Sequence, residues 1–469
     1  MLIPARLLIV VAFLLSSIES HSQNLWAPMP YNSEFNTGNW IRGLYVDTTT
    51  GTLYIGGQFK VVDGDTLNRV AYWNGQKWAK MDQGTGPHGE IVFAMLNYED
   101  TIYAAGAFDA DDGCPATGIM KWDGTHWQKV GQGNCEGTNK VFGSGGEILT
   151  LQEIDDKIYA GGIYDTIGCL HAKGLGSWNG SDWQTVNGYD TSGAGGSISS
   201  IVKYKNKLYV GGYMGAPDGY TGCCILYFDS TEWKTVGGGF QGGGIQDVWD
   251  MVVYKGELYV AGRFHDYGNP ANYIARWDGT QWHDVGGGMN APVFSLLVYH
   301  DKLYAIGGFT QAGTVPTSQM ACWDGTKWCG ISGFTINQSG PADVYNDTII
   351  LTCNYLAQGI DTIRNFVKFL GGDYMDTCEA TFGISELNQS LNSFPLSPNP
   401  VQNLLTINLP SSAATIAVYD VAGRKMELPT SNSANTIQLN TTALPSGMYL
   451  LQLVNTKTGM SEVEKFVKE

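Results

Sequence analysis

One short segment recurs along the chain and limits the possible folds more than any other feature. It is Trp277-Asp278-Gly279-Thr280-Gln281-Trp282, in which a turn dipeptide lies between two aromatic residues. The first aromatic residue recurs as Trp73, Trp122, Trp178, Phe228, Trp277, Trp323 and Phe369, and the second as Trp78, Trp127, Trp183, Trp233, Trp282, Trp328 and Tyr374. A spacing of roughly 50 residues predicts seven similar units that bury their apolar faces against one another.

A second pattern, Tyr-x-x-Gly, precedes each aromatic pair. It occurs at Tyr54 and Gly57, Tyr103 and Gly106, Tyr159 and Gly162, Tyr209 and Gly212, Tyr259 and Gly262, and Tyr304 and Gly307. The seventh unit departs from it, with Ile350 and Cys353 in these places. Alternation of polar and apolar residues, as in the segment Asp301 to Ile306, predicts that the pattern lies on a β-strand.

The segment between the two aromatic residues predicts a tight hairpin. Asn-Gly and Asp-Gly tolerate the positive φ angles that such a turn requires. These dipeptides occur at Asn74-Gly75, Asp123-Gly124, Asn179-Gly180, Asp278-Gly279 and Asp324-Gly325, whereas Asp229-Ser230 lacks the glycine. The two rings are expected to face each other across the hairpin and to add about 0.5 to 1.5 kcal/mol beyond burial. We therefore interpret them as core residues.

Four strands in each of seven units predict an all-β fold, a seven-bladed β-propeller over residues 24–385. The segment Leu25 to Met29 resembles the outer strand Lys77 to Met81, although no unit precedes it. We expect this N-terminal strand to close the ring by completing the last sheet. The alternative is an extra edge strand, because Tyr374 to Cys378 could supply the last strand of the seventh unit.

The second strand of several units ends in a glycine pair, at Gly56-Gly57, Gly161-Gly162, Gly211-Gly212 and Gly307-Gly308. These pairs, each followed by the aromatic pair, resemble the repeats of kelch-like propellers. The resemblance covers roughly Trp40 to Phe382, and it implies a shared architecture but not a shared partner.

Composition and an N-terminal signal indicate an exported protein. The formal charge is −17 and the pI about 4.7, which argues against nucleic acid as a partner. Arg6, the apolar run Leu7 to Leu15 and the small residues Ser20-His21-Ser22 predict a signal peptide over residues 1–22. No later stretch is long and apolar enough to predict a transmembrane segment in the mature chain.

The C-terminal part predicts a second domain. Residues 386–393 are interpreted as a linker and residues 394–469 as a small β-sandwich, with strands at Leu404 to Leu409, Thr415 to Tyr419, Thr436 to Leu439, Gly447 to Leu453 and Val463 to Lys468.

Four motifs in this domain carry a specific resemblance. They are Ser397-Pro398-Asn399-Pro400, Val418-Tyr419-Asp420-Val421-Ala422-Gly423-Arg424, Leu444-Pro445-Ser446-Gly447-Met448-Tyr449 and Lys465-Phe466-Val467-Lys468. In this order they resemble the type A C-terminal sorting domain of the type IX secretion system. The resemblance implies that this machinery is a partner and that the domain is removed on arrival. It also implies a mature protein that is secreted or attached to the outer surface of a Gram-negative bacterium.

The sequence offers no candidate catalytic residues, no metal ligands and no cofactor. No two of the histidines after the signal have metal-ligand spacing, and neither a Gly-x-Ser-x-Gly nor a phosphate-binding motif occurs. Structural calcium is conceivable at Asp63-Gly64-Asp65 or Asp109 to Asp112. Neither cluster continues into a twelve-residue calcium loop, so we interpret both as solvated turns.

Candidate ligand-binding residues lie where the loops of one propeller face should gather, since such loops carry function more often than the repeated core does. They are Trp40, Arg42, Tyr189, Phe240, Trp249 and Asp250, which offer stacking and hydrogen bonding suited to sugars or peptides. The alternative, favoured for Trp249, is local packing between neighbouring units.

The nine cysteines of an exported chain predict disulfides with one thiol left over. The position of each cysteine in the repeat favours Cys114 with Cys135, Cys169 with Cys223 or Cys224, Cys322 with Cys329, and Cys353 with Cys378.

These observations favour a secreted or cell-surface binding protein with a glycan or protein ligand and no chemistry of its own. One alternative is an extracellular glycan-acting enzyme whose acidic residues come from several blades. Another is a structural envelope protein that binds only its own copies.

Overall fold

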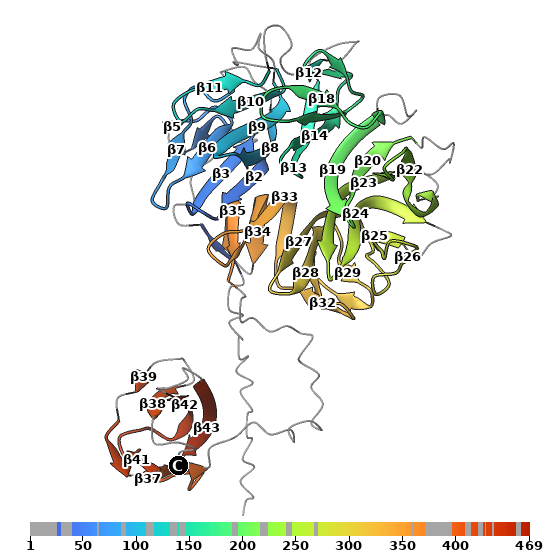
Figure 1. Cartoon of the computed structure of the whole chain (residues 1–469). Coiled ribbons are helices and arrows are strands. Elements are labelled where there is room, and N and C mark those ends of the chain that lie inside the picture. The colour runs from blue at the N-terminus through green and yellow to red at the C-terminus, as the bar shows by residue number, and fades with distance from the viewer. Residues whose placement is uncertain are drawn as a thin grey trace, which may run out of the picture. The chain divides into compact units, whose positions relative to one another are not determined.

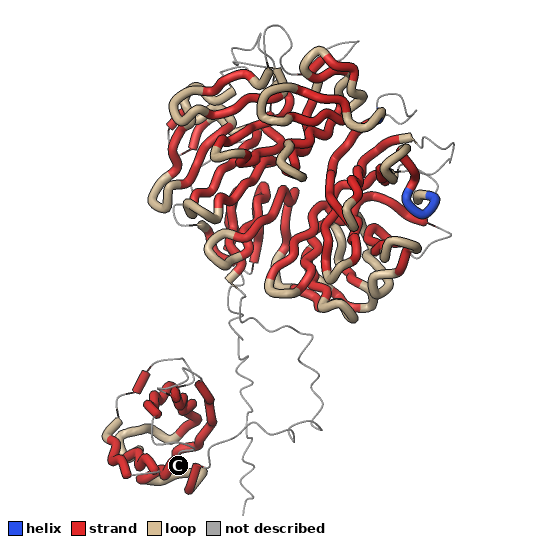
Figure 2. Tube along the Cα trace, in the orientation of Figure 1, coloured by secondary structure: helices blue, strands red, loops and turns tan. Residues whose placement is uncertain are grey.

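The protein consists of two compact units, residues 1–381 and 382–469, in a computed structural model. The structure describes residues 26–29, 40–62, 65–85, 91–108, 117–131, 138–139, 146–189, 196–215, 224–240, 246–266, 271–358, 361–370, 396–408, 414–420, 425–426, 428–433, 436–455 and 461–469. In these ranges every regular element is a strand except the short 3-10 helix η3 (Val236–Gly238) (Figure 2). The predicted all-β class is confirmed. The proposed signal peptide and linker lie outside the described residues.

The described residues of unit 1 form seven four-stranded antiparallel sheets, which we number from the N-terminus. Sheet 1 has β2 (Ile41–Asp47), β3 (Thr52–Gly57), β6 (Val70–Trp73) and β7 (Trp78–Lys80), and sheet 2 has β8 (Ile91–Tyr98), β9 (Thr101–Ala107), β10 (Ile119–Trp122) and β11 (Trp127–Lys129). Sheet 3 has β13 (Glu147–Glu153), β14 (Ile158–Ile163), β17 (Leu175–Trp178) and β18 (Trp183–Thr185), and sheet 4 has β19 (Gly196–Tyr204), β20 (Lys207–Met214), β21 (Ile225–Phe228) and β22 (Trp233–Thr235). Sheet 5 has β23 (Asp247–Tyr254), β24 (Glu257–Asp266), β25 (Ala271–Trp277) and β26 (Trp282–His283), and sheet 6 has β27 (Val293–Tyr299), β28 (Lys302–Gly307), β31 (Met320–Trp323) and β32 (Trp328–Ile331). Sheet 7 has β33 (Thr335–Val344), β34 (Ile349–Gln358), β35 (Asp361–Phe369) and β1 (Trp26–Pro28).

Shorter strands lie in the connections between the second and third strands of some sheets. They are β4 (Val61–Val62) with β5 (Asp65–Thr66), β15 (Thr166–Ile167) with β16 (Leu170–His171), and β29 (Gln311–Ala312) with β30 (Val315–Pro316). A further short strand, β12 (Thr138–Asn139), comes from the connection between sheets 2 and 3 and pairs with β15.

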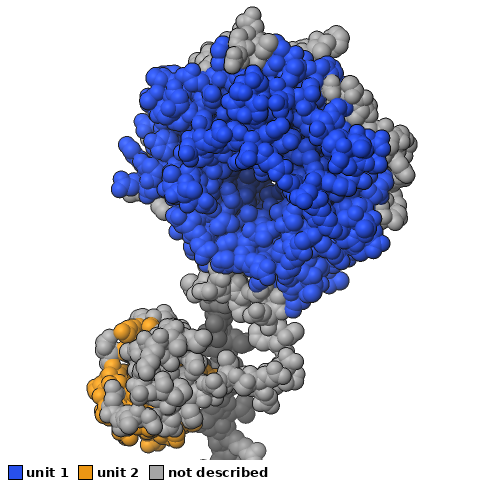
Figure 3. All heavy atoms as spheres, viewed as in Figure 1, with its two compact units in different colours: residues 1–381 blue, residues 382–469 orange. Residues whose placement is uncertain are grey.

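The seven sheets follow one another around a common centre. The first strand of each sheet contacts the first strand of the next, in the order β2, β8, β13, β19, β23, β27 and β33, and β33 contacts β2 again. Figure 1 shows the sheets of unit 1 side by side around this centre. Figure 3 shows a central depression there on the face in view.

The N-terminal strand completes the last sheet, as the sequence predicts. Trp26 of β1 pairs with Phe369 of β35, and their ring centroids lie 5.0 Å apart. The backbone N–H of Trp26 donates to Oε1 of Gln358 over 3.1 Å, and Nε2 of the same amide donates to the carbonyl of Trp26 over 2.6 Å. The assignment of Tyr374 as the ring opposite Phe369 is wrong, because Trp26 occupies that position. Tyr374 itself lies outside the described residues.

The aromatic pairs pack across their hairpins as expected. Trp277 lies opposite Trp282 in the register, with ring centroids 5.2 Å apart and both rings buried. The indole N–H of Trp282 also donates to the carbonyl of Val236 in the preceding repeat over 3.2 Å. Trp127, Trp183 and Trp328 make the same kind of bond to the carbonyls of Met81, Val130 and Val285. Each of these hairpins therefore joins its sheet to the one before it.

The turn of this hairpin depends on one carboxylate and one glycine. Oδ1 of Asp278 accepts hydrogen bonds from the backbone N–H groups of Thr280 and Gln281 over 2.7 and 2.9 Å. The glycine that follows has a φ of +104°, a conformation that L side chains disfavour. Ser230 takes the same position in sheet 4 with a φ of +89°, so this hairpin is strained where the sequence lacks glycine.

Unit 2 has two four-stranded sheets that share one core. The first has β36 (Leu396–Ser397), β37 (Leu404–Asn408), β41 (Thr436–Asn440) and β40 (Thr430–Ser433), and the second has β39 (Lys425–Met426), β38 (Ala414–Asp420), β42 (Gly447–Asn455) and β43 (Ser461–Lys468). Leu405 and Ile407 from one sheet and Leu451 and Phe466 from the other belong to the same buried cluster. All five strands that the sequence predicts in this unit are present.

The structure corrects two of the predicted disulfides. Cys322 and Cys329 lie opposite each other on β31 and β32, but Cys322 is a buried thiol whereas Cys329 is disulfide-bonded. Opposition in a ladder therefore did not produce a bridge here. Cys353 is also a buried thiol, so its pairing with Cys378 is wrong.

Two further cysteines narrow the remaining pairings. Cys169 is disulfide-bonded, and Cys224 is a buried thiol, which rules Cys224 out as its partner. Cys114, Cys135, Cys223 and Cys378 lie outside the described residues, so the pairing of Cys114 with Cys135 stays a prediction.

Candidate functional site

The first strands of sheets 1 to 6 carry a β-bulge at the same level. In each, the register with the second strand skips one residue, and the skipped residues are Arg42, Phe93, Leu149, Ser199, Trp249 and Phe294. A bulge adds one residue to a strand and re-aims its side chain, and bulges are common next to functional sites. The bulges therefore display a set of unlike side chains at one level of the inner strands.

The glycine of the Tyr-x-x-Gly pattern makes these bulges possible. A Cβ on Gly57 would lie 2.0 Å from the carbonyl oxygen of Trp40, and one on Gly262 would lie 2.1 Å from that of Asp247. The equivalent glycines Gly106, Gly162, Gly212 and Gly307 meet the carbonyls of Ile91, Glu147, Ser197 and Pro292 at similar distances. The glycine recurs because the backbones of the first and second strands approach closely at the bulge. Its position in the sequence therefore indicates where the bulge of the first strand lies.

Sheet 7 departs from this pattern, and the departure creates a small hollow. Cys353 stands where the other sheets have glycine, and the register between β33 and β34 skips Gly340 and Pro341 instead of one residue. A second bulge in β34 skips Asn354. A Cβ on Gly340 would lie 2.3 Å from Oγ1 of Thr352 and 2.7 Å from the carbonyl oxygen of Ile41, so the glycine allows sheets 7 and 1 to approach closely.

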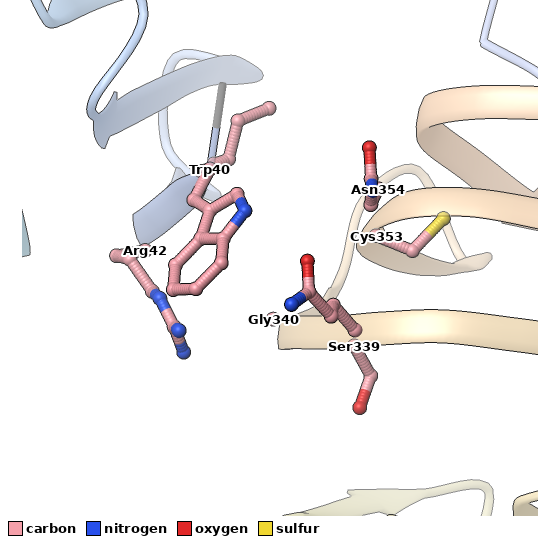
Figure 4. A pocket seen from close by; sticks show the side chains of 8 residues that line it. Trp40, Arg42, Ser339, Gly340, Cys353 and Asn354 are labelled. Carbon is pink, nitrogen blue, oxygen red and sulfur yellow. The ribbon is translucent and has the colours of Figure 1, made fainter. Parts of the chain in front are cut away.

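The hollow lies between the start of β2 in sheet 1 and the two bulges of sheet 7. It is small and open to solvent, and it is lined by Trp40, Ile41, Arg42, Gln338, Ser339, Gly340, Cys353 and Asn354. The guanidinium carbon of Arg42 lies 4.6 Å from the centroid of the Trp40 ring. Figure 4 shows Arg42 on one side of this ring and Cys353 and Asn354 on the other. The hollow thus contains two of the residues predicted from the sequence.

Several polar groups of the hollow have unused hydrogen-bonding capacity. Oγ of Ser339 is buried and has no hydrogen-bond partner in the structure. Nδ2 of Asn354 donates to Oδ1 of Asn337 over 3.1 Å, which leaves its own carbonyl oxygen available. Trp40 has 36% of its surface exposed. Burial lowers the pKa of the Arg42 guanidinium from its ordinary value. This guanidinium contacts the ring of Trp40. Such groups can bind a polar ligand that contains a ring.

A second aromatic group lies at the bulges of sheets 5 and 6. The rings of Trp249 and Phe294 lie 5.3 Å apart, and the guanidinium carbon of Arg263 lies 5.6 Å from the centroid of Trp249. The indole N–H of Trp249 donates to Oδ2 of Asp247 over 2.7 Å, whereas Oδ1 of Asp247 is buried without a partner. Burial raises the pKa of Asp247, and both the indole hydrogen bond and the charge of Arg263 oppose the shift. Phe294 keeps 38% of its surface exposed, so this group is also accessible. The sequence predicted Trp249 as a candidate but not Phe294. The recurring glycine of this unit, Gly307, marks the bulge and could have indicated Phe294.

Asp250 has a structural role in this geometry. Its Oδ2 accepts hydrogen bonds from the backbone N–H of Leu296 over 2.8 Å and from the hydroxyl of Ser295 over 3.4 Å, both in the next sheet. Its Oδ1 accepts the N–H of Met251 over 2.8 Å. Burial raises the pKa of Asp250 to about 6, although these three hydrogen bonds favour the charged form. Oδ2 joins sheets 5 and 6, and Oδ1 accepts from the neighbouring residue of its own strand. Both oxygens are thus engaged within the protein, so Asp250 is not placed to bind a ligand.

Tyr189 and Phe240 are also not at an accessible surface. Each has 0% of its surface exposed. The ring of Tyr189 lies 5.1 Å from that of Trp233, and Phe240 stacks on Phe264 with centroids 4.1 Å apart and an interplanar angle of 1°. Their positions next to loops suggested exposure, but both rings fill space between sheets. Neither residue can line a binding face in this conformation.

The residues that the structure describes include no group of three or more His, Cys, Asp or Glu side chains arranged to hold a metal ion. Asp109 to Asp112, Asp63 and Gly64 lie outside the described residues. Within the described ranges, no helix is long and apolar enough to cross a membrane.

The sorting motifs of unit 2 come together around Asn399. Its Nδ2 donates to the carbonyl of Lys465 over 3.0 Å, and its Oδ1 accepts the N–H of Val467 over 2.9 Å. Pro398 and Pro400, on either side, both follow cis peptide bonds. The first motif is thus fixed to the last strand of the chain.

The other two motifs meet on neighbouring strands. Tyr449 stacks on Phe466 with ring centroids 5.5 Å apart and donates from its hydroxyl to the carbonyl of Pro445 over 2.9 Å. Asp420 of β38 pairs with Tyr449 of β42, and Tyr419 precedes it on the same strand. Gly447 begins β42, whereas Gly423 lies outside the described residues.

Comparison with known proteins identifies this C-terminal unit. Residues 396–469 match the family model described as "Secretion system C-terminal sorting domain". The expected sorting domain is confirmed, and the protein is exported by the type IX secretion system to the cell surface or the medium. No curated protein matches the chain.

Two solved structures show a distant similarity to large parts of the chain. One is PorZ, an essential bacterial surface component of the type-IX secretion system of Porphyromonas gingivalis, with 14% sequence identity and a TM-score of 0.37. That match covers 92% of this chain and 65% of PorZ. The other is a structural genomics protein of unknown function from Bacteroides thetaiotaomicron, with 10% identity, a TM-score of 0.32, and coverage of 73% of this chain and 72% of that chain.

Proposed function

We propose that the protein is a secreted or cell-surface binding protein whose unit 1 is a seven-bladed β-propeller and binds a glycan or protein ligand. The observation that carries the proposal is the hollow beside Trp40, where a partly exposed ring lies next to polar groups with unused hydrogen-bonding capacity. Ligand sites typically combine an aromatic or apolar wall with a few placed polar groups.

Two observations support the propeller. The first is the set of seven four-stranded sheets, and the second is the cycle of contacts between their first strands, which ends with β33 beside β2. In such a ring each sheet buries its faces against its neighbours, and the N-terminal strand in sheet 7 protects an edge that would otherwise be open. The kelch-like glycine pairs have a physical role here, because one glycine of each pair lies against the bulge of the first strand: Gly57, Gly162, Gly212 and Gly307.

The export route follows from both ends of the chain. A signal peptide over residues 1–22 would direct the chain across the inner membrane. The sorting domain would then guide it through the type IX system and be removed, which leaves unit 1 at the surface or in the medium. Binding at the cell surface suits a ligand that is itself extracellular, such as a glycan or a surface protein.

The enzymatic alternative has less support. A glycan-cleaving site requires two carboxyl groups that face the same substrate. The lining of the hollow contains none, and both oxygens of Asp250 accept hydrogen bonds from backbone N–H groups of sheets 5 and 6. We therefore propose binding and not hydrolysis.

The test is a binding screen with the full chain lacking residues 1–22. The protein is applied to immobilised glycans and to surface proteins of the producing cell, beside a panel of glycoside hydrolase substrates. We expect stable binding without turnover, and we expect Trp40→Ala to weaken it. The variant Phe294→Ala serves as the matched control, because it removes an exposed ring from the second aromatic group and leaves the hollow intact. Turnover without stable binding, or binding that neither variant affects, would contradict the proposal.

A further inference from the structure

The charge of the hollow is unusual for this protein. The chain carries a formal charge of −17, yet the eight residues that line the hollow include no Asp or Glu. Their only charged side chain is Arg42. The hollow is therefore a positively charged site on an acidic molecule.

Among the residues that the structure describes, Arg42 has no carboxylate partner. Its guanidinium contacts the face of Trp40, 4.6 Å from the ring centroid. Arg276, in contrast, has one guanidinium nitrogen 2.5 Å from a carboxylate oxygen of Glu257. An arginine that is partly removed from water and left without a counter-charge costs free energy unless another group pairs with it. A ligand anion can supply that group.

The other groups of the hollow are neutral. Burial raises the pKa of the Cys353 thiol to about 12, so this residue adds no negative charge near neutral pH. Ser339 has a buried hydroxyl without a partner, and Asn354 has an available amide oxygen. One guanidinium among neutral donors and acceptors matches a ligand with a single negative charge and several hydroxyl groups. The planar fork of arginine matches a carboxylate with two parallel hydrogen bonds.

We propose that the hollow binds a sugar ring that carries a carboxylate, with Arg42 pairing to the carboxylate and Trp40 packing on the ring. Asn354 then accepts a hydrogen bond from a sugar hydroxyl through its amide oxygen. The inference rests on the proposed function and narrows its ligand to acidic glycans.

The experiment compares three probes by saturation-transfer NMR titration of the full chain lacking residues 1–22. The probes are methyl glucuronide, methyl glucoside, which lacks the carboxylate, and glucose 6-sulfate, which has one negative charge in a tetrahedral group. We expect the glucuronide to bind at least about tenfold more tightly than the glucoside, because hydrogen bonds to charged groups are stronger than those between neutral groups. The glucose 6-sulfate should bind less tightly than the glucuronide.

Three variants locate the preference. Arg42→Met should bring the glucuronide to the affinity of the glucoside, and Arg42→Lys should keep part of the difference. Arg263→Met is the matched control, because Arg263 also lies over a tryptophan ring but belongs to the second aromatic group. It should leave the preference unchanged. Thermal melts followed by tryptophan fluorescence confirm that each variant is folded.

The possible failures are distinct. Equal binding of glucuronide and glucoside by the wild type, or a preference that persists in Arg42→Met, overturns the inference and leaves glycan binding in place. Tighter binding of the sulfate overturns the choice of a carboxylate. If the folded wild type binds none of the three probes but binds a surface protein in the screen above, the inference fails and the proposed function stands. If it binds nothing in either experiment, both fail.

Discussion

Replacement of Gly307 by alanine tests the link between the recurring glycine and the bulge. A Cβ at this position would lie 2.3 Å from the carbonyl oxygen of Pro292, 2.8 Å from Cα of Val293 and 3.0 Å from Cδ1 of Phe309. Ordinary van der Waals contact begins near 3.4 Å, so the backbone of β27 would have to move by 3.4 − 2.3 = 1.1 Å. Two of these three neighbours are backbone atoms, which cannot rotate away as the end of a side chain can.

The cost can be estimated from overpacked cores, which typically lose 1 to 3 kcal/mol. Because β27 pairs with β28 and also contacts β23 and β33, its shift is resisted on several sides, and we expect a loss of about 3 kcal/mol. For a domain of this size, that loss lowers the Tm by about 4 °C. The neighbouring Gly308→Ala is a matched control, because its Cβ would lie 3.7 Å from Phe294 and 4.0 Å from the carbonyl of Pro292. It should change stability by less than about 0.5 kcal/mol, or raise it slightly through the unfolded state.

Tryptophan fluorescence is a selective assay for this pair of variants. All 14 tryptophans of the chain lie between Trp26 and Trp328, so the signal reports unit 1 and not the sorting domain. The reasoning fails if Gly307→Ala melts like the wild type, since the glycine would then not be needed for the bulge. It also fails if Gly308→Ala loses as much stability, since the cost would then come from replacing any glycine at the end of β28.

Three further predictions concern the hairpins and the inner strands. Ser230→Gly should stabilise unit 1 by about 1 kcal/mol in a thermal melt, because Ser230 has a φ of +89° where other hairpins have glycine, and an unchanged or lower Tm would contradict the strain. Trp282→Phe should cost about 1 to 3 kcal/mol, because it leaves the carbonyl of Val236 without the indole N–H, and a loss no greater than that of the conservative Tyr227→Phe would argue against this bond. Asp250 has a folded-state pKa of about 6, above the ordinary value near 3.9, so its contribution to stability is present below about pH 4 and is lost as the pH rises through about 6. Asp250→Asn should flatten the decline in stability over this range, and an identical slope in denaturant titrations at pH 4 to 7 would refute the assignment.

The repeated parts of the fold were predictable from the sequence. The aromatic pairs and turn dipeptides mark one hairpin in each unit, and the recurring glycine marks the position of the second strand. Local sequence patterns determine these features because the contacts lie within about 50 residues. The closing strand was predictable for a related reason, since Trp26 repeats the pattern of an outer strand.

The candidate site was only partly predictable. Trp40 and Asn354 line the same hollow but are separated by more than 300 positions in the chain, so no local pattern joins them. The sequence did indicate that the seventh unit is irregular, because Cys353 replaces the glycine, and the hollow lies at that irregularity. Tyr189 and Phe240 were misplaced because a position near a loop does not show which way a ring points. In both cases the ring fills the gap between two sheets.

The composition of sheet 7 has a consequence for the order of events during export. Its outer strand β1 precedes the rest of unit 1 in the chain, whereas its partner β35 is the last strand of unit 1, and Trp26 and Gln358 bond to each other across 332 positions. The sheet therefore cannot be completed until nearly all of unit 1 is available, which favours late completion of sheet 7. A later cut beyond Leu370 breaks no strand pairing that the structure describes in unit 1. The protein can thus lose its sorting domain and keep sheet 7 complete, whereas loss of only a few residues around Trp26 would expose the edge of β35.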